Sequence, residues 1–384
     1  MKKADSNKRT IEILLLVIIS FSPLVPNTIR VSLILLLVAS NLTQAKVIGK
    51  RQMLVFVLLF GAFSVSTVND LANVRLGSFS VLNIYFPLCF VLGFIISQKY
   101  SLREYLWRLE KVVFVMAVFS LVGVFVYTLF PTIVYRLPTY NYYHTSHKTA
   151  LLFNVLLSNN QIVQRNAGIA WEPGAFQFLL NLGLYSHIKL NEKSSTVRFL
   201  VYALALISTK STAGLPVFLI ITYELAKESR LFRIFAILTV VAFFDFIREE
   251  FLYHYYFKLF GSQAFLSRLT PMANAFETGL KNLLGLGNTK YDLVYREFGL
   301  GAFDSFGQII VRYGLPLLAV IAYLLFKILQ NDRTLFVIIT VTFLSQTVWH
   351  LPVITPFYFM IFPKSDKGGL RENTMDHKHS LARS

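Results

Sequence analysis

The sequence contains a single cysteine, Cys89, and this scarcity excludes two kinds of construction. A lone thiol can form neither an intramolecular disulfide framework nor a cysteine-built metal site. Charged side chains are also scarce, because Asp, Glu, Lys and Arg make up 15% of the 384 residues, against roughly 25% in ordinary soluble domains. A soluble globular domain is therefore excluded.

Apolar residues take the place of the missing charges. They make up 55% of the chain, and apolar stretches of about 15 to 25 residues recur along it, a length that crosses a hydrocarbon layer roughly 30 Å thick. We therefore predict an all-α, polytopic integral membrane protein with about 12 (10–12) transmembrane helices. The predicted spans cover residues 11–26, 28–44, 52–68, 79–97, 112–131, 173–188, 197–209, 213–226, 232–247, 307–326, 334–349 and 351–363.

The charge is one-sided, because 37 Lys and Arg residues outnumber 20 Asp and Glu residues and give a net charge of +17. The basic residues lie mainly in every second connection between the predicted spans. This alternation of basic and neutral connections is the positive-inside pattern, which indicates cytoplasmic loops rather than a nucleic-acid partner. We expect one transmembrane domain over residues 1–363, a polar, disordered cytoplasmic tail over 364–384, and a cytoplasmic N-terminus. An eleven-span topology is the alternative if 334–363 crosses only once. The basic segments are the N-terminus, 45–51, 98–111, 189–198, 227–233 and 327–333.

Two connecting segments on the opposite, external side are much longer than the rest and cover residues of about 132–172 and 248–306. Loops of this length in a compact protein are usually functional. Within the second loop, apolar residues at helical spacing predict an amphipathic helix over 262–284, which would lie along the outer membrane surface.

Four groups of polar residues stand near the outer ends of the predicted spans. In the first, Arg165 precedes the run Trp171-Glu172-Pro173-Gly174 at the end of the first long loop. Proline suits the first turn of a helix, so Glu172 would sit at the positive end of the helix dipole and be ionised. Such a carboxylate can accept a proton, bind sugar hydroxyls or pair with Arg165. Alternatively, Glu172 only complements the dipole, and Trp171 anchors the membrane interface.

The second group, Asp304, Gln308 and Arg312, recurs every four residues and forms a polar stripe on the outer turns of a span. An arginine at membrane depth is costly and usually faces a partner or a wet cavity. The alternative is a structural pairing of Asp304 with Arg312 through Gln308. In the third group, Gln346 and His350 lie at another outer helix end, where a histidine either acts as a base near neutral pH or is simply hydrogen-bonded.

The fourth group is Arg268 with Lys281 and Lys290 in the second long loop. These cations could hold a lipid-linked phosphate, for which arginine offers bidentate contact, or lie against lipid headgroups. The nearby run Gly285-Leu-Gly287-Asn is not a phosphate loop, because it lacks the lysine and the strand-to-helix setting.

An external site with arginines and carboxylates suits an anionic, lipid-linked substrate. If the leaving group is a diphosphate, arginines can neutralise its developing charge, and a base can deprotonate the attacking hydroxyl. We expect no metal and no cofactor.

In order and spacing, several segments between about residue 79 and residue 363 resemble the Wzy-like O-antigen and exopolysaccharide repeat-unit polymerases. The resemblance implies a metal-independent glycosyltransferase of the bacterial inner membrane. It would move a growing glycan from undecaprenyl diphosphate onto another lipid-linked repeat unit at the extracytoplasmic face. The similar segments are RNAGIAWEPGAFQFLLNLG (165–183), Ser208–Gly214, 268–314 and Ser345–His350.

The resemblance also implies roles for individual residues. Arg165 and Arg312 would contact diphosphate or sugar, and Glu172 would be the base or would orient the hydroxyl. Asp304 and His350 would be secondary catalytic candidates. The expected partners are an undecaprenyl diphosphate-linked oligosaccharide, the lipid bilayer, a chain-length regulator and a flippase. The expected substrate-binding residues are Arg268, Trp171, Gln308 and Lys281.

Two other functions stay open at this point. O-antigen ligases, which transfer a glycan to a lipid or protein acceptor, rely on a histidine in a long external loop; His254 lies in such a loop, but no matching local motif surrounds it. A transporter or flippase of lipid-linked sugars would be expected to show paired repeats and polar residues near mid-membrane. The charges here cluster instead at the outer ends of the spans.

Overall fold

The computed structural model describes residues 2–42, 49–73, 80–142, 145–150, 153–158, 161–190, 195–211, 213–228, 262–298 and 304–362, and most of these residues are helical. The bundle helices are α1 (Lys2–Phe21), α2 (Asn27–Leu42), α3 (Lys50–Asn73), α4 (Leu82–Lys99), α5 (Leu102–Leu129), α7 (Pro173–Leu190), α8 (Thr196–Ser208), α9 (Gly214–Glu228), α15 (Ser305–Asn331) and α16 (Arg333–Ser345). The other helices are α6 (Pro131–Arg136), α13 (Ser262–Lys281), α14 (Asn288–Phe298) and α17 (Phe357–Met360).

The helices agree with the predicted all-α membrane class. Within the described part of the chain, four helices are long and apolar enough to cross a membrane: Lys50–Leu71, Leu82–Lys99, Leu102–Leu129 and Ser305–Asn331. The shorter apolar helices are Asn27–Leu42, Thr196–Ser208, Gly214–Tyr223 and Arg333–Ser345. The count of twelve spans stays a prediction, and the predicted span at 232–247 and the tail at 364–384 lie outside the described residues.

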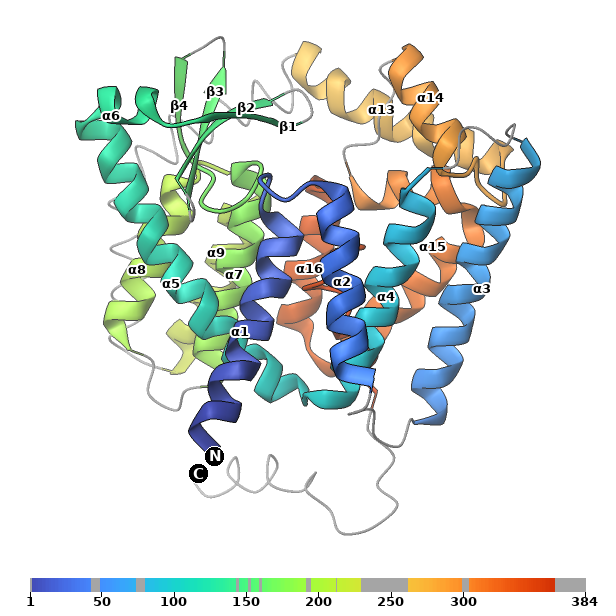
Figure 1. Ribbon diagram of the computed structural model, residues 1–384, viewed down its shortest axis with the longest axis horizontal. Coiled ribbons are helices and arrows are strands. Elements are labelled where there is room, and N and C mark those ends of the chain that lie inside the picture. Colours follow the sequence, from blue (N-terminus) through green and yellow to red (C-terminus); the bar gives the residue numbers. More distant parts are fainter. Residues whose placement is uncertain are drawn as a thin grey trace.

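Short, well-capped connections turn consecutive helices back on one another. Tyr100 and Ser101 separate α4 from α5, and the Ser101 side chain accepts a hydrogen bond from the backbone N–H of Glu104. Asp332 alone separates α15 from α16, and its carboxylate accepts from the backbone N–H of Leu335. Each cap satisfies a donor that a helix start leaves open. These turns align the helices side by side as a bundle (Figure 1).

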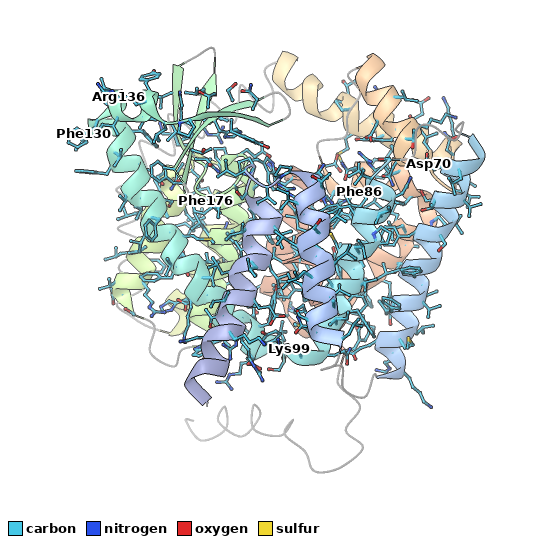
Figure 2. All side chains as sticks on the ribbon, in the orientation of Figure 1. Asp70, Phe86, Lys99, Phe130, Arg136 and Phe176 are labelled. Carbon is cyan, nitrogen blue, oxygen red and sulfur yellow. The ribbon has the colours of Figure 1, made fainter. Side chains whose placement is uncertain are left out.

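The two ends of the bundle differ in character (Figure 1). One end, here called the basic end, holds the first residues of α1, the start of α3 and the connections α4–α5, α7–α8 and α15–α16. Figure 2 shows Lys99 at this end and Asp70, Phe86 and Phe176 toward the other. The second end, the capped end, is covered by α6, a small sheet, α13 and α14. The described parts of both long loops thus cover the same end of the bundle, opposite the basic connections.

The sheet lies in the first long loop, where the sequence suggested no strands. It consists of β1 (Thr139–Tyr142), β2 (Thr145–Ala150), β3 (Phe153–Ser158) and β4 (Gln161–Asn166), all antiparallel in the order β1-β2-β3-β4. Val155 of β3 is buried against Tyr127 and Val134. The Asn154 side chain donates to the carbonyls of Ile169 and Ala170 at 2.9 and 3.2 Å. The sheet therefore anchors the residues that lead into α7.

The predicted helical span at 351–363 is wrong in its secondary structure. Residues 346–362 form turns with only the four-residue α17, and most of them are buried. At the capped end, Ser305 Oγ donates to the Gln346 carbonyl at 2.6 Å; at the basic end, Gln52 Nε2 donates to the Phe359 carbonyl at 3.0 Å. Non-helical backbone at membrane depth is tolerated where protein surrounds it and supplies such partners.

A buried polar network at the basic end, here called the knot, joins the three helices α1, α2 and α4. Lys99 and Glu12 form an ion pair at 2.6 Å, and each side chain is 8% exposed. Asn41 Nδ2 and Tyr100 Oη donate to the two Glu12 carboxylate oxygens at 2.6 and 2.5 Å. Lys99 Nζ also donates to Asn41 Oδ1 at 2.8 Å. The charges are paired and hydrogen-bonded, which is the condition for burying them.

We expect Glu12→Gln to lower the thermal unfolding temperature of the protein in detergent, because Lys99 then stays buried beside neutral partners. Removing one member of a buried ion pair costs about 3–5 kcal/mol. The matched control is Glu277→Gln, since Glu277 pairs with Lys281 at 2.6 Å but both side chains are exposed. That change should cost less than about 1 kcal/mol. Equal shifts for the two variants would contradict the structural role of the knot.

His147 makes the stability of the sheet depend on pH. Its side chain is fully buried in β2, and burial lowers the pKa of His147 from 6.5 to about 4. At a pH between about 4 and 6.5, the His147 side chain binds a proton when β2 is unfolded but stays neutral when it is buried in the folded sheet. The sheet is therefore fully stable above pH 6.5 and loses up to about 1.4 kcal/mol per pH unit as the pH falls toward 4.

We expect hydrogen exchange of the β2 and β3 amides, corrected for its intrinsic pH dependence, to speed up over this pH range. His147→Leu should remove the effect, because leucine does not titrate. An unchanged pH dependence in that variant would show that another group is responsible.

Candidate functional site

The first part of the site is a break in α15. Gly314 has a non-helical conformation, with φ 72° and ψ −168°. Two residues later Pro316 has no backbone N–H, so it cannot bond the carbonyl of Arg312 as a helix requires. That carbonyl accepts instead from Gly287 N and Ser66 Oγ, both at 3.0 Å.

The break exchanges hydrogen bonds between α15 and the loop that precedes α14. Leu315 N–H turns away from its helical partner, the Val311 carbonyl, and donates to the Leu283 carbonyl at 2.9 Å. The Val311 carbonyl accepts from Leu286 N at 2.7 Å. A Cβ on Gly314 would collide with the Leu283 carbonyl oxygen. We call this junction of residues 283–287 with 311–316 the Gly314 joint.

The Gly314 joint brings α14 over the side chain of Arg312. Arg312 donates to Asn288 Oδ1 at 2.7 Å and to Asp292 Oδ1 at 3.0 Å, and its guanidinium lies 4.0 Å from the centre of the Tyr291 ring. The Arg312 side chain is 6% exposed and that of Asp292 38%, so the ion pair opens toward the surface. Arg312 Nε is buried and has no hydrogen-bond partner among the described residues.

A buried network behind Arg312 holds α14 against α3 and α4. Asn288 Nδ2 donates to Asn83 Oδ1 at 2.7 Å, and Asn83 Nδ2 donates to Asp70 Oδ2 at the same distance. Asp70 also accepts from the Thr289 hydroxyl at 2.9 Å. These buried polar groups satisfy one another, as low-dielectric surroundings require. Sequence reasoning missed Asp70, Asn83, Asn288 and Asp292, because their spacing matches no local motif.

The second part of the site is the start of α7. Pro173 occupies the first helical position and the half-buried Glu172 directly precedes it, as the sequence predicts. The Gln346 side chain packs on Gly174 so closely that a Cβ there would overlap its amide nitrogen. Trp171 stacks on Phe21, with ring centres 5.8 Å apart. Trp171 is thus packed against the end of α1.

The segment that begins at Gln346 connects the two parts. Ser305 Oγ binds the Gln346 carbonyl, and Trp349 Nε1 donates to Gln308 Oε1 at 3.1 Å. The next residue, His350, lies 4.3 Å from Phe86 between ring centres, and Arg312 lies 5.8 Å from the same ring. His350 Nδ1 is buried without a partner among the described residues. Among the described contacts, Glu172 is linked to Arg312 through this segment, because Gln346 packs on Gly174 two residues after Glu172. We call Glu172, Gln346, Gln308, His350 and Arg312 the capped-end cluster.

Other residues predicted for the site have different positions. Asp304 caps α15 by accepting from Gly307 N at 2.6 Å, and burial raises the pKa of its carboxyl. Arg312 pairs with Asp292 rather than with Asp304, so the suggested pairing through Gln308 is wrong. Lys281 points outward and pairs with Glu277. The Arg268 side chain lies outside the described part of the chain.

Arg165 lies in β4, and its side chain reaches the turn between α8 and α9. Its guanidinium donates to the carbonyls of Thr209 and Lys210, each at 3.2 Å. The neighbouring Asn166 donates to Ser208 Oγ at 2.9 Å. The structure therefore joins Arg165 to the Ser208–Gly214 segment, but the described contacts do not connect it to Arg312.

Comparisons with known proteins give no relative: no family model, no curated protein and no solved structure matches this chain. Within the described ranges, no three or more His, Cys, Asp and Glu side chains are grouped so that they could hold a metal ion.

We expect Gly314→Ala to weaken the Gly314 joint, because alanine must adopt a positive φ and its Cβ has no space. Such strain costs about 1–3 kcal/mol. Hydrogen exchange of residues 283–292 should then speed up. The matched control is Gly61→Ala, since a Cβ at Gly61 in α3 meets nothing within 4 Å, and Ala should favour the helix there by roughly 0.5–1 kcal/mol. Slow exchange retained in Gly314→Ala would contradict the role of the joint.

Proposed function

We propose that this protein is a membrane glycosyltransferase that extends a polysaccharide by joining lipid-linked repeat units. The growing glycan leaves undecaprenyl diphosphate and is transferred to a hydroxyl of a second lipid-linked unit. The proposed reaction site is the capped-end cluster. The resemblance of the sequence to Wzy-like polymerases supports this assignment.

One observation carries the proposal: two buried polar atoms flank Phe86 without partners among the described residues. They are Arg312 Nε and His350 Nδ1. A buried polar group without a hydrogen bond costs about 1–3 kcal/mol, so such groups call for an explanation. A bound substrate that supplies an acceptor to Arg312 and a polar group to His350 would satisfy both.

The distribution of charge supports an extracytoplasmic site. Basic connections gather at one end of the bundle, and cytoplasmic loops carry the excess of Lys and Arg in membrane proteins. The capped-end cluster lies at the other end, beneath the described parts of both long loops (Figure 1). We infer that this end faces away from the cytoplasm of a bacterial inner membrane, where the lipid part of the substrate would lie in the bilayer beside the spans.

The proposed reaction breaks the bond between the anomeric carbon and the diphosphate oxygen, and it forms a bond from that carbon to the acceptor oxygen. Glu172 takes the proton of the acceptor hydroxyl. The diphosphate leaves with its negative charge, and Arg312 stabilises that charge as it develops. Arg165 is given no role in this step, because its guanidinium binds the Thr209 and Lys210 carbonyls outside the capped-end cluster. Gln308 and Trp171 would line the sugar path, and Asp304 stays in place as a helix cap.

A transporter of lipid-linked sugars is the second candidate. The non-helical residues 346–362 and the break at Gly314 favour it, because transporters build their sites from discontinuous helices. Against it, residues 346–362 are packed with buried aromatic rings, among them Trp349, Phe357 and Tyr358. We therefore favour the enzyme.

We expect Glu172→Gln to lower elongation of lipid-linked repeat units by the purified, reconstituted protein about 100-fold or more, because a positioned base contributes about 10²–10⁴-fold. The matched control is Glu277→Gln, the same change at an exposed position, which should keep full activity. Both variants should keep the unfolding temperature of the wild type.

Full elongation by Glu172→Gln would remove Glu172 from the reaction. Movement of lipid-linked units across the bilayer without elongation would identify a transporter. Attachment of the glycan to a different acceptor, with no elongation, would identify a ligase.

A further inference from the structure

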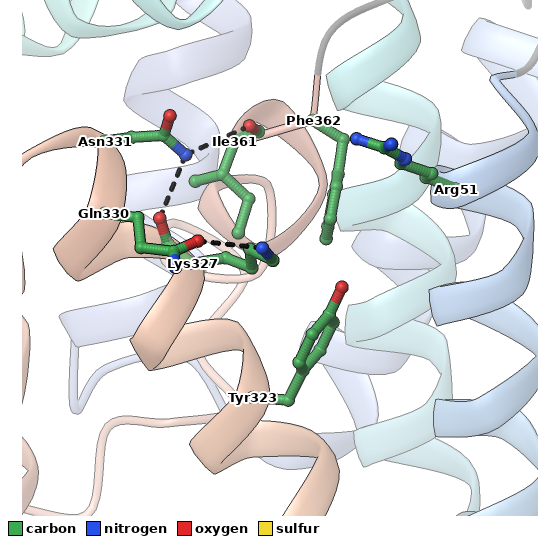
Figure 3. A pocket seen from close by; sticks show the side chains of 7 residues that line it. All are labelled: Arg51, Tyr323, Lys327, Gln330, Asn331, Ile361 and Phe362. Atoms are coloured by element: carbon green, nitrogen blue, oxygen red, sulfur yellow. Dashed lines mark hydrogen bonds between the residues drawn. The ribbon is translucent and has the colours of Figure 1, made fainter.

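A cavity of about 370 Å³ lies at the basic end, far from the capped-end cluster. The start of α3 contributes Arg51, the end of α15 contributes Tyr323 and Lys327, and the end of residues 346–362 contributes Phe362 (Figure 3). Lys327 lies four residues after Tyr323, so both side chains share one face of α15. The cavity thus forms where two helices and the end of residues 346–362 meet.

The lining of this cavity is cationic, and none of its residues is acidic. Among the described contacts, Lys327 Nζ donates to Gln330 Oε1 at 2.8 Å, and no carboxylate pairs with Lys327 or Arg51. An ammonium carries three N–H donors and a guanidinium five. Both cations therefore keep donors for a further acceptor.

The position of Arg51 also favours an anion. Arg51 lies in the first turn of α3, which contains no acidic residue. A helix start carries partial positive charge, so a cation there is unfavourable and an anion nearby is favourable. An anionic group between Arg51 and Lys327 would interact well with both cations and with the helix start.

The surfaces beside the cavity point to a lipid as the source of that anion. Leu54 and Leu58 follow Arg51 on the same face of α3 and are 58% and 46% exposed. On α15, Phe326 and Tyr323 are 51% and 44% exposed. These apolar side chains lead from the cavity toward the middle of the bundle, where acyl chains would lie against them.

We propose that this cavity binds the phosphoryl headgroup of an anionic phospholipid, with Arg51 and Lys327 contacting the phosphate oxygens. Basic pockets between transmembrane helices are suited to such headgroups. The bound lipid would cover Phe362 and so hold the end of residues 346–362 in place. This site is independent of the proposed transfer reaction.

The test measures the thermal unfolding temperature of the purified full-length protein in a neutral detergent, with added phosphatidylglycerol, phosphatidylcholine or inorganic phosphate. We expect phosphatidylglycerol to raise the unfolding temperature and the other two to have little effect. In Arg51→Gln/Lys327→Gln, the phosphatidylglycerol concentration for half of the shift should rise about tenfold or more, because two charge-assisted hydrogen bonds are lost. The single variant Lys327→Arg keeps both the charge at this position and Arg51. It should therefore keep most of the wild-type response to phosphatidylglycerol.

The matched control is Arg103→Gln, which removes an exposed cation at the same end but outside the cavity. A full response in this control and a lost response in the double variant would support the proposal. An equal shift with inorganic phosphate would show a site for the free ion and overturn the lipid assignment. No shift in the wild type, or the same loss in Arg103→Gln, would overturn the site itself.

Discussion

The missing N–H of Pro316 is the constraint on which the capped end depends. It leaves the Arg312 carbonyl without its helical donor, and Gly287 N and Ser66 Oγ replace that donor. The replacement fixes the loop before α14 on α15, because Gly314 lets the two backbones approach within hydrogen-bond distance. The position of α14 over Arg312, and with it the environment of that side chain, follows from this single break.

The buried Arg312 is stable because neighbouring side chains bind two of its guanidinium nitrogens and leave the Nε–H for a substrate in the proposed reaction. Asn288 and Asp292 hold two guanidinium nitrogens, and the Tyr291 ring covers one face. Desolvating an unpaired guanidinium would cost several kcal/mol, so this pairing is a precondition for burial. It also fixes the direction of the remaining Nε–H. A donor that is oriented before the substrate arrives needs no reorganisation when charge develops, which is the condition for electrostatic catalysis.

The sequence predicted correctly the features that depend on residues close together in the chain, such as helix starts and amphipathic helices. Pro173 at a helix start and the amphipathic helix around 262–284 follow from residues within a few positions of one another. The separation of basic from long connections follows from the distribution of charge over the loops. Partners distant in sequence could not be predicted in this way. The four-residue spacing of Asp304 and Arg312 suggested that they pair, but Asp292 reaches Arg312 because the Gly314 joint folds α14 back. Residues 346–362 resembled a helical span by hydropathy, and only their enclosure by other helices permits turns there. The strands at 139–166 lack a clear apolar alternation.

The two sites share α15 and residues 346–362, which raises the question of whether one affects the other. Coupling between sites requires an element with two arrangements that each ligand favours differently. Residues 346–362 show one arrangement, filled by Trp349 and Tyr358, whose hydroxyl donates to the Trp349 carbonyl at 2.9 Å. Close-packed interiors resist small displacements. An anion bound at Arg51 and Lys327 therefore stabilises the fold as a whole, and a change in turnover would require this aromatic packing to have a second arrangement.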